Sequence, residues 1–188
     1  MAEVEADRQV RKTRAAILGA FNKLILERRY GDIRVADIIR GADIGRSTFY
    51  EHFRNKDAIL RESLSHVVAV LADAVCDDCD LNRLQFILDH FRENSRLARG
   101  LMIGPSAPQV VIVLAGLIEE RLTTWQEKSG RTPAVPLALI AAQTAVAQLG
   151  LVRAWLNGGP PCSSAMIAAA LHRSALAATR VLFSPTPL

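Results

Sequence analysis

Side chains suited to binding DNA gather in one short stretch of this 188-residue chain, Val35–Lys56. Arg46 carries a planar guanidinium that can donate two hydrogen bonds to guanine O6 and N7. Hydroxyl, phenol and imidazole groups follow it and can contact base edges or phosphate oxygens. Lys56 opens the following helix, where charge and helix dipole both favour an anion. The candidate DNA contacts in this stretch are Arg46, Ser47, Thr48, Tyr50, His52 and Lys56.

Two short predicted helices position these groups. The first, Val35–Arg40, turns Ile38 and Ile39 inward, and residues 41–43 break it. The second, Gly45–Phe53, has Phe49 and Phe53 one turn apart as anchors to the core. Two short helices joined by a tight connection are typical of a helix-turn-helix, whose second helix enters the major groove.

The flanking sequence predicts a helix on each side of this pair. Apolar residues form one stripe of an amphipathic helix over Arg11–Arg28. Asn55 is placed to cap a helix that continues to Val75, with Asp57 in its first turn. The net charge also differs between the N-terminal third, which holds these helices, and the rest of the chain. Residues 1–61 contain 13 Lys and Arg against 9 Asp and Glu, whereas residues 62–188 are neutral. A basic head on a neutral body suggests that the head meets a polyanion.

The remainder of the chain predicts only helices, so the expected fold class is all-α. We expect a three-helix helix-turn-helix head on a larger helical body, with domain boundaries at residues 8–55 and 56–184. Prolines at helix starts and glycines at helix ends support this division. The predicted body helices are Leu81–Glu93, Ser95–Met102, Pro108–Glu127, Pro136–Leu156 and Ser163–Leu182.

Three features bear on membrane association and cellular compartment. Thr132–Val152 holds 21 residues without a charge, but its prolines, glutamines and alanines favour a buried or subunit-interface helix over a membrane span. The first residues lack the apolar core of a signal peptide. The odd number of cysteines, three, indicates reduced thiols. We therefore expect no membrane partner and a cytoplasmic protein that associates with the nucleoid when it is bound to DNA.

The N-terminal third resembles the TetR family of bacterial transcriptional regulators over about residues 10–61. The residues that carry the resemblance are Ile17-Leu18, Ala20-Phe21, Val35, Asp37-Ile38, Ala42, Ile44, the run Ser47–Phe53, Asn55–Asp57 and Leu60. The resemblance implies a homodimer whose heads read the half-sites of a palindromic operator in double-stranded DNA. It also implies a body that binds a small molecule, dimerisation through the last two helices, and a DNA-backbone contact by Lys56.

Three positions depart from the family pattern. Asp43 replaces the usual glycine of the turn, and it tolerates a left-handed backbone less well than glycine. Arg34 replaces the threonine that usually caps the second helix, which removes a cap but offers a possible phosphate contact. Arg29 stands where a glycine is frequent. We therefore add Arg34 to the predicted DNA contacts.

The body offers weaker signals. Ligand pockets are mostly apolar with a few polar groups. On that basis the candidate effector contacts are Phe86, His90, Met102, Trp125, Gln143 and Trp155. The charge-poor body favours an apolar or weakly polar ligand. No catalytic, nucleotide-binding or metal motif is recognisable, so we expect no enzyme, no cofactor and no metal.

Two alternatives use the same head. In one, Cys76 and Cys79 form a thiol or metal sensor, although neighbouring carboxylates should raise the thiol pKa values and a helix corner is the simpler interpretation. In the other, the body docks a protein partner, and the chain acts as a DNA-bound co-activator or adaptor. The main interpretation is a ligand-responsive homodimeric repressor.

Overall fold

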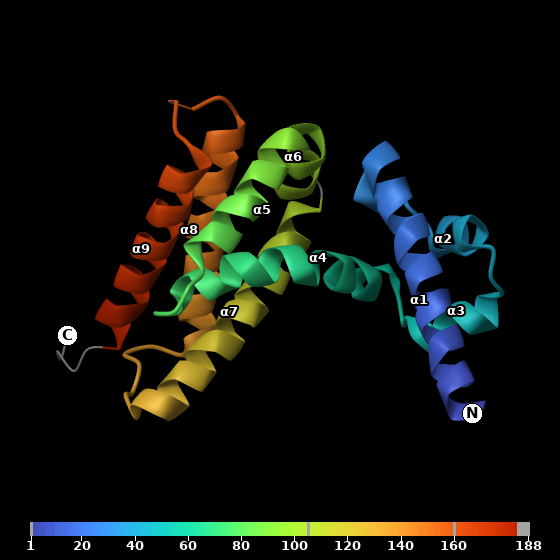
Figure 1. Ribbon diagram of the computed structural model, residues 1–188, viewed down its shortest axis with the longest axis horizontal. Coiled ribbons are helices and arrows are strands. Elements are labelled where there is room, and N and C mark those ends of the chain that lie inside the picture. Colours follow the sequence, from blue (N-terminus) through green and yellow to red (C-terminus); the bar gives the residue numbers. More distant parts are fainter. Residues whose placement is uncertain (1, 105, 160, 184–188) are drawn as a thin grey trace. The chain divides into compact units, whose positions relative to one another are not determined.

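The computed structural model describes residues 2–104, 106–159 and 161–183, and every regular element in those ranges is a helix (Figure 1). This confirms the all-α fold class. The chain divides into two compact units, one ending at Leu64 and the other beginning at Ser65. We call the first unit the head and the second the body.

The head is a small bundle whose core is built by apolar side chains from all four of its α-helices. Ile17 and Phe21 of α1, Ile38 of α2, Phe49 of α3 and Ile59 of α4 are all fully buried. Each such side chain contributes about 1.5–3 kcal/mol by leaving water. The helical elements are α1 (Ala2–Glu27), the 3-10 turn η1 (Tyr30–Asp32), α2 (Val35–Ala42), α3 (Arg46–His52) and the start of α4 (Lys56–Ala72).

Helix α1 begins nine residues earlier than the apolar periodicity predicts, at Ala2 instead of Arg11. Its first turns carry no core stripe, so periodicity could not reveal them. Alanine and glutamate are strong helix formers, and acidic residues favour the N-terminal end of the helix dipole. Asp7 and Arg11 form an ion pair of 2.6 Å one turn apart, which supports this extension.

The body packs its helices around an apolar core to which Leu88 of α5, Ile118 of α7, Leu149 of α8 and Leu171 of α9 contribute. Helices α7 and α8 pack against each other, and α9 packs against both α5 and α8 (Figure 1). Asp73–Val75, which were predicted to continue the preceding α-helix, form the 3-10 helix η2. The elements are the end of α4, η2 (Asp73–Val75), α5 (Leu81–Glu93), α6 (Ser95–Ile103), α7 (Ala107–Ser129), α8 (Leu137–Leu156) and α9 (Ser164–Leu182).

Helix α8 contains most of the long uncharged run seen in the sequence. By length and composition it could cross a membrane, and 39% of its most apolar window is buried inside the protein. One face of α8, including Ala141, Ala145 and Val152, lies in the body core. The opposite face exposes Leu139 and Val146. The helix is therefore two-sided, with a core face and an outward apolar face.

Candidate nucleic-acid interface

The turn between α2 and α3 sets the orientation of α3 relative to α2. Asp43 has φ 52° and ψ 51°, a left-handed conformation. Its N–H donates to the carbonyl of Arg40 (3.3 Å), and the N–H of Ile44 donates to that of Ile39 (3.3 Å). These two bonds form a Schellman motif, in which glycine is the usual left-handed residue. Asp43 thus occupies the position predicted for it and adopts the conformation that glycine would adopt more easily.

Helix α3 presents two distinct sides. Phe49 is fully buried and Phe53, just after the helix, is 3% exposed, so the two predicted anchors hold α3 against the head. The guanidinium of Arg14 lies 4.6 Å from the Phe53 ring centroid, and its Nε donates to Glu62 at 2.9 Å. These contacts connect α1, α3 and α4 beneath the predicted DNA-reading surface.

The other side of α3 is polar and accessible. Arg46, Ser47 and Tyr50 are exposed, while Thr48 and His52 are partly buried. The Arg46 guanidinium lies 5.8 Å from the Tyr50 ring centroid, which keeps the two groups together. The five residues predicted to read DNA from this helix are therefore on one seven-residue element.

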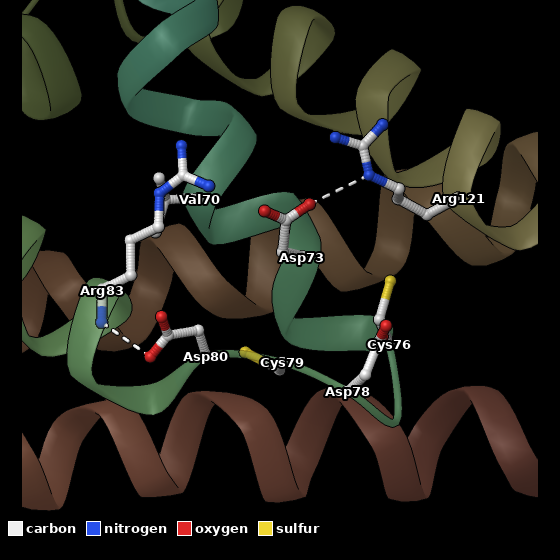
Figure 2. A pocket seen from close by; sticks show the side chains of 8 residues that line it. All are labelled: Val70, Asp73, Cys76, Asp78, Cys79, Asp80, Arg83 and Arg121. Carbon is white, nitrogen blue, oxygen red and sulfur yellow. Dashed lines mark hydrogen bonds and ion pairs between the residues drawn. The ribbon is translucent and has the colours of Figure 1, made fainter.

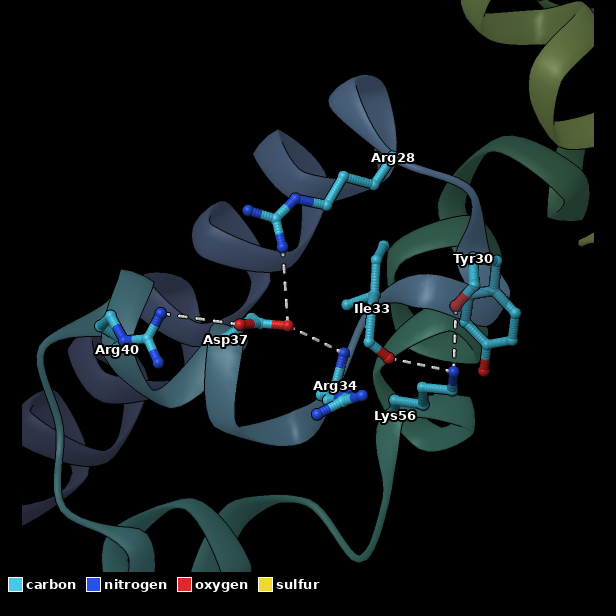
Figure 3. Close-up of polar contacts among 7 residues, drawn as sticks. All are labelled: Arg28, Tyr30, Ile33, Arg34, Asp37, Arg40 and Lys56. Atoms are coloured by element: carbon cyan, nitrogen blue, oxygen red, sulfur yellow. Dashed lines mark hydrogen bonds and ion pairs between the residues drawn. The ribbon is translucent and has the colours of Figure 1, made fainter.

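Lys56, the predicted phosphate contact, also makes contacts inside the head. Its Nζ donates to the carbonyls of Tyr30 (2.9 Å) and Ile33 (3.1 Å) and lies 4.4 Å from the Tyr30 ring centroid (Figure 3). The Tyr30 hydroxyl donates to Asp57. Burial, together with this bond to the Asp57 carboxylate, raises the pKa of Tyr30. An ammonium has three N–H donors, so one remains beyond these two bonds. The N-terminus of α4 carries its predicted cap, because Asn55 Oδ1 accepts from the Ala58 N–H at 2.9 Å.

An arginine cluster surrounds Asp37 at the start of α2 (Figure 3). The Asp37 carboxylate accepts from the Arg34 N–H at 3.2 Å and pairs with Arg28 (3.6 Å) and Arg40 (3.7 Å). A guanidinium has no acceptor, so Arg34 gives no side-chain cap, as predicted. Asp37 compensates by bonding the N-cap N–H from the third helical position. The sequence analysis missed Arg28 and Arg40; the Asp37–Arg40 spacing of three residues was the available signal.

The six predicted effector contacts do not share one site. Phe86 is 70% exposed on α5, and His90 and Gln143 are also exposed. Met102 is buried on α6. The two tryptophans have contacts within the protein: Trp125 packs edge-on against Phe183 (4.8 Å), and Trp155 Nε1 donates to the Cys162 carbonyl (2.9 Å).

Cys76 and Cys79 lie in the corner between η2 and α5, beside a cavity of about 340 Å³ (Figure 2). Burial raises the pKa of Cys79 to about 11 and raises that of Cys76; nearby carboxylates, Asp73 first, act in the same direction. The direction agrees with the sequence argument, but burial is the larger cause. Figure 2 shows the two sulfur atoms pointing in different directions. Within the described residues, no group of three potential ligands could hold a metal ion. The cavity is lined by Val70, Asp73, Cys76, Asp78, Cys79, Asp80, Arg83 and Arg121.

The geometry of the head defines a helix-turn-helix DNA-binding unit, and comparisons with known proteins agree. Residues 17–63 match the model of the "Bacterial regulatory proteins, tetR family". A regulator named YxbF from Bacillus subtilis (strain 168), uncharacterised and of the HTH type, is 36% identical over 72 residues. That match covers 38% of this chain and 19% of the relative. The HTH-type transcriptional regulator EthR of Mycobacterium tuberculosis is 43% identical over 53 residues, which cover 28% of this chain and 24% of EthR. The chain thus spans about a fifth to a quarter of the length of these relatives.

Similarity of fold extends over both units. The crystal structure of a TetR transcriptional regulator from Streptococcus agalactiae 2603V has a TM-score of 0.59 and 25% identity, covering 93% of this chain and 99% of that one. The match of the head and this similarity of fold together support a relationship to the TetR family. The chain combines a head that matches the helix-turn-helix region of these regulators with a helical body.

Proposed function

We propose that this regulator is a cytoplasmic homodimeric repressor that binds a palindromic operator and releases it when a small molecule enters the body. The observation that carries the proposal is the polar, accessible side of α3, held by Phe49 and Phe53. In this arrangement Arg46 reads a guanine, and the small hydroxyls of Ser47 and Thr48 contact base edges or phosphates. Tyr50 and His52 donate to phosphate oxygens.

The arginine cluster extends this interface along the DNA backbone. Arg28 and Arg40 have side chains 49% and 80% exposed, and Asp37 orients both. In helix-turn-helix proteins the first helix of the motif crosses the backbone, so Arg28, Arg34 and Arg40 are suited to phosphate contacts. Such contacts set position and affinity but carry no sequence information. Lys56 adds a further contact through the donor that is not engaged inside the head.

Dimerisation through the last two helices is supported by their outward faces. Leu139 and Val146 of α8 are 61% and 58% exposed, and Met166 and Val181 of α9 are 61% and 71% exposed. Small exposed residues lie along the same faces: Ala147, Gly150, Ala170 and Ala177. An apolar stripe with small residues on two neighbouring helices suits a four-helix bundle with a two-fold-related copy. Helix α8 would then be covered on both faces, which accounts for its composition.

The end of α4 offers a route for regulation within the body. Asp73 of η2 accepts from Arg121 of α7 (2.9 Å), and His172 of α9 lies 3.0 Å from the Ala74 carbonyl. Asp77 pairs with Arg180 of α9. A ligand that shifts α7 or α9 therefore also moves the end of α4. Moving α4 changes the separation of two recognition helices from the roughly 34–36 Å that matches one turn of DNA. A difference of about 1–3 kcal/mol between the two states changes affinity about 5- to 150-fold.

The test is salt-dependent binding of the purified protein to the DNA upstream of its own gene and to random DNA. The proposal expects a steep salt dependence and at least about 10³-fold preference for a palindromic site, with a dimer in sedimentation. A monomer that binds with preference would contradict the dimer. A folded dimer without any preference would contradict operator recognition by the ligand-free protein and favour the adaptor alternative.

A further inference from the structure

Gln148, near the middle of α8, has a buried amide without a partner. The residue is 3% exposed, and neither Oε1 nor Nε2 has a hydrogen-bond partner in the described chain. Two other buried polar side chains of the body are satisfied locally. The Thr144 hydroxyl donates to the Ile140 carbonyl at 2.8 Å, and the Thr179 hydroxyl donates to that of Ala175 at 2.9 Å. Gln148 is therefore the exception among its neighbours on the core face of α8.

The amide is not required for packing. Besides Thr144, the buried residues near Gln148 on this face of α8 are the apolar Ala141, Ala145, Leu149 and Val152, so an apolar side chain would be compatible with the surroundings. Burying a carboxamide without hydrogen bonds is unfavourable, and most buried polar groups in native proteins have a partner. Two further buried atoms lack a partner on the α7–α8 pair, Gln109 Oε1 and Arg153 Nε. No group of the described residues supplies a partner for the Gln148 amide.

We propose that Gln148 is the polar contact for the effector, and that the effector is an uncharged, mainly apolar molecule carrying a carbonyl beside an N–H or O–H. This inference rests on the proposed ligand-responsive function. A carboxamide presents an acceptor and a donor side by side, so it is satisfied by a group that offers both. A primary amide or lactam meets this requirement. An ionised carboxylate does not, because it has no donor for Oε1, and burying its charge beside apolar side chains is unfavourable.

Gln148 differs in position from Gln143, the glutamine that the sequence suggested as an effector contact. Gln143 was the predicted glutamine contact, but it is exposed, and the residue five positions later on the same helix is buried. A difference of five residues rotates a side chain by about 140° around a helix, since each residue advances about 100°. The two glutamines therefore lie on different faces of α8.

The first experiment needs no ligand. Gln148→Met keeps an unbranched side chain and removes the amide, with Gln148→Leu as a second variant. Because an unpartnered buried group is removed, we expect the Tm of the ligand-free protein to rise by about 3–8 °C. The control is Gln85→Met on α5, a half-buried glutamine of the same unit, whose Tm should stay within about 2 °C. A fall in Tm for both Gln148 variants would show that the amide is already satisfied, and would overturn the proposal.

The second experiment uses hexanamide and hexanoate, which share a chain length and differ in the polar group. Hexanamide should raise the Tm of the wild-type protein and of Gln85→Met but not that of Gln148→Met. Its dissociation constant should be at least about 10-fold lower than that of hexanoate. Equal binding of the two probes, undiminished binding to Gln148→Met, or no binding of hexanamide to the wild type would each overturn the assignment. These stability and binding measurements are made without DNA, and the effect of hexanamide on the operator complex is measured separately. If hexanamide binds through Gln148 and the operator complex is unaffected, the ligand-responsive function fails while the binding site stands.

Discussion

Replacing Lys56 with alanine should loosen the head as well as weaken its contact with DNA. The ammonium donates to two carbonyls of the η1 segment, Tyr30 and Ile33, and lies over the Tyr30 ring. Hydrogen bonds from a charged group contribute about 1.5–3 kcal/mol each, and a cation over an aromatic ring adds about 0.5–1 kcal/mol. Water partly replaces these bonds because Lys56 is only half-buried. We therefore expect a net loss of about 2–3 kcal/mol from the stability of the head.

Hydrogen exchange measures this loss in the head separately from the body. Both tryptophans, Trp125 and Trp155, belong to the body, so tryptophan fluorescence would not report on the head directly. A loss of 2–3 kcal/mol corresponds to roughly 30- to 150-fold faster exchange of the most protected head amides, since about 1.4 kcal/mol is a factor of ten. Peptides from the body serve as the internal reference. The matched variant is Lys23→Ala, an exposed lysine of α1, which should leave exchange unchanged.

The DNA side of the prediction is measured on the same proteins. Lys56→Ala should weaken specific and random DNA by nearly the same factor and lower the salt slope by about one. Unchanged protection of the head, combined with weaker DNA binding, would refute the reasoning that Lys56 holds η1 in place. Faster exchange with an unchanged salt slope would show instead that Lys56 acts only inside the head.

Four further predictions test other parts of the molecule. Arg46→Ala should lose about 1–3 kcal/mol of discrimination at one base step, measured on single-base operator variants; equal weakening of every sequence would contradict its role. At position 43, the head measured by hydrogen exchange should be most stable with glycine, less stable with aspartate and least stable with alanine, in steps of about 0.5–1 kcal/mol. The reason is that glycine adopts φ 52° without strain. If Asp43→Ala were the most stable of the three proteins, this reasoning would be contradicted. The pKa of Cys79 is raised to about 11, so the protonated thiol contributes stability below pH 9 that is lost as the pH rises toward 11. In urea unfolding, the free energy of unfolding should therefore fall less between pH 7 and pH 10 for Cys79→Ser than for the wild type. Val146→Glu should give a monomer in sedimentation with a folded body, and a persistent dimer would place the interface elsewhere.

The sequence alone identified the features that depend on neighbouring residues. The bounds of α5 were predicted correctly from periodicity, and in the structure Asp80 caps the helix by accepting from the N–H groups of Asn82 (2.9 Å) and Arg83 (3.1 Å). The turn at Asp43 and the cap at Asn55 follow equally from local backbone chemistry. The buried side of α3 was predicted for the same reason, since Phe49 and Phe53 at a spacing of four residues define one side of a short helix, and the side that we propose reads DNA is the opposite one.

Tertiary structure decided which polar groups have partners. Residue types and spacing did not indicate that Lys56 reaches back to Tyr30 and Ile33, 26 and 23 residues earlier. The cluster around Asp37 brings Arg28 from the end of α1 to the start of α2. Such contacts depend on how helices pack across a loop, and residue type and periodicity do not specify that packing.

In the body, too, residue type and periodicity did not predict which side chains are buried. Periodicity predicted that α8 is helical and largely apolar, but a helix that is apolar on most of its surface does not reveal which side meets its neighbours. The packing of α7 and α9 against α8 covers the side that carries Gln148 and leaves Gln143 in solvent. The sequence by itself therefore determined an all-helical chain with a helix-turn-helix head, because local hydrogen bonds and side-chain spacing fix those features. Only the tertiary structure decided which groups of the body are buried, because burial depends on neighbours that are distant along the chain.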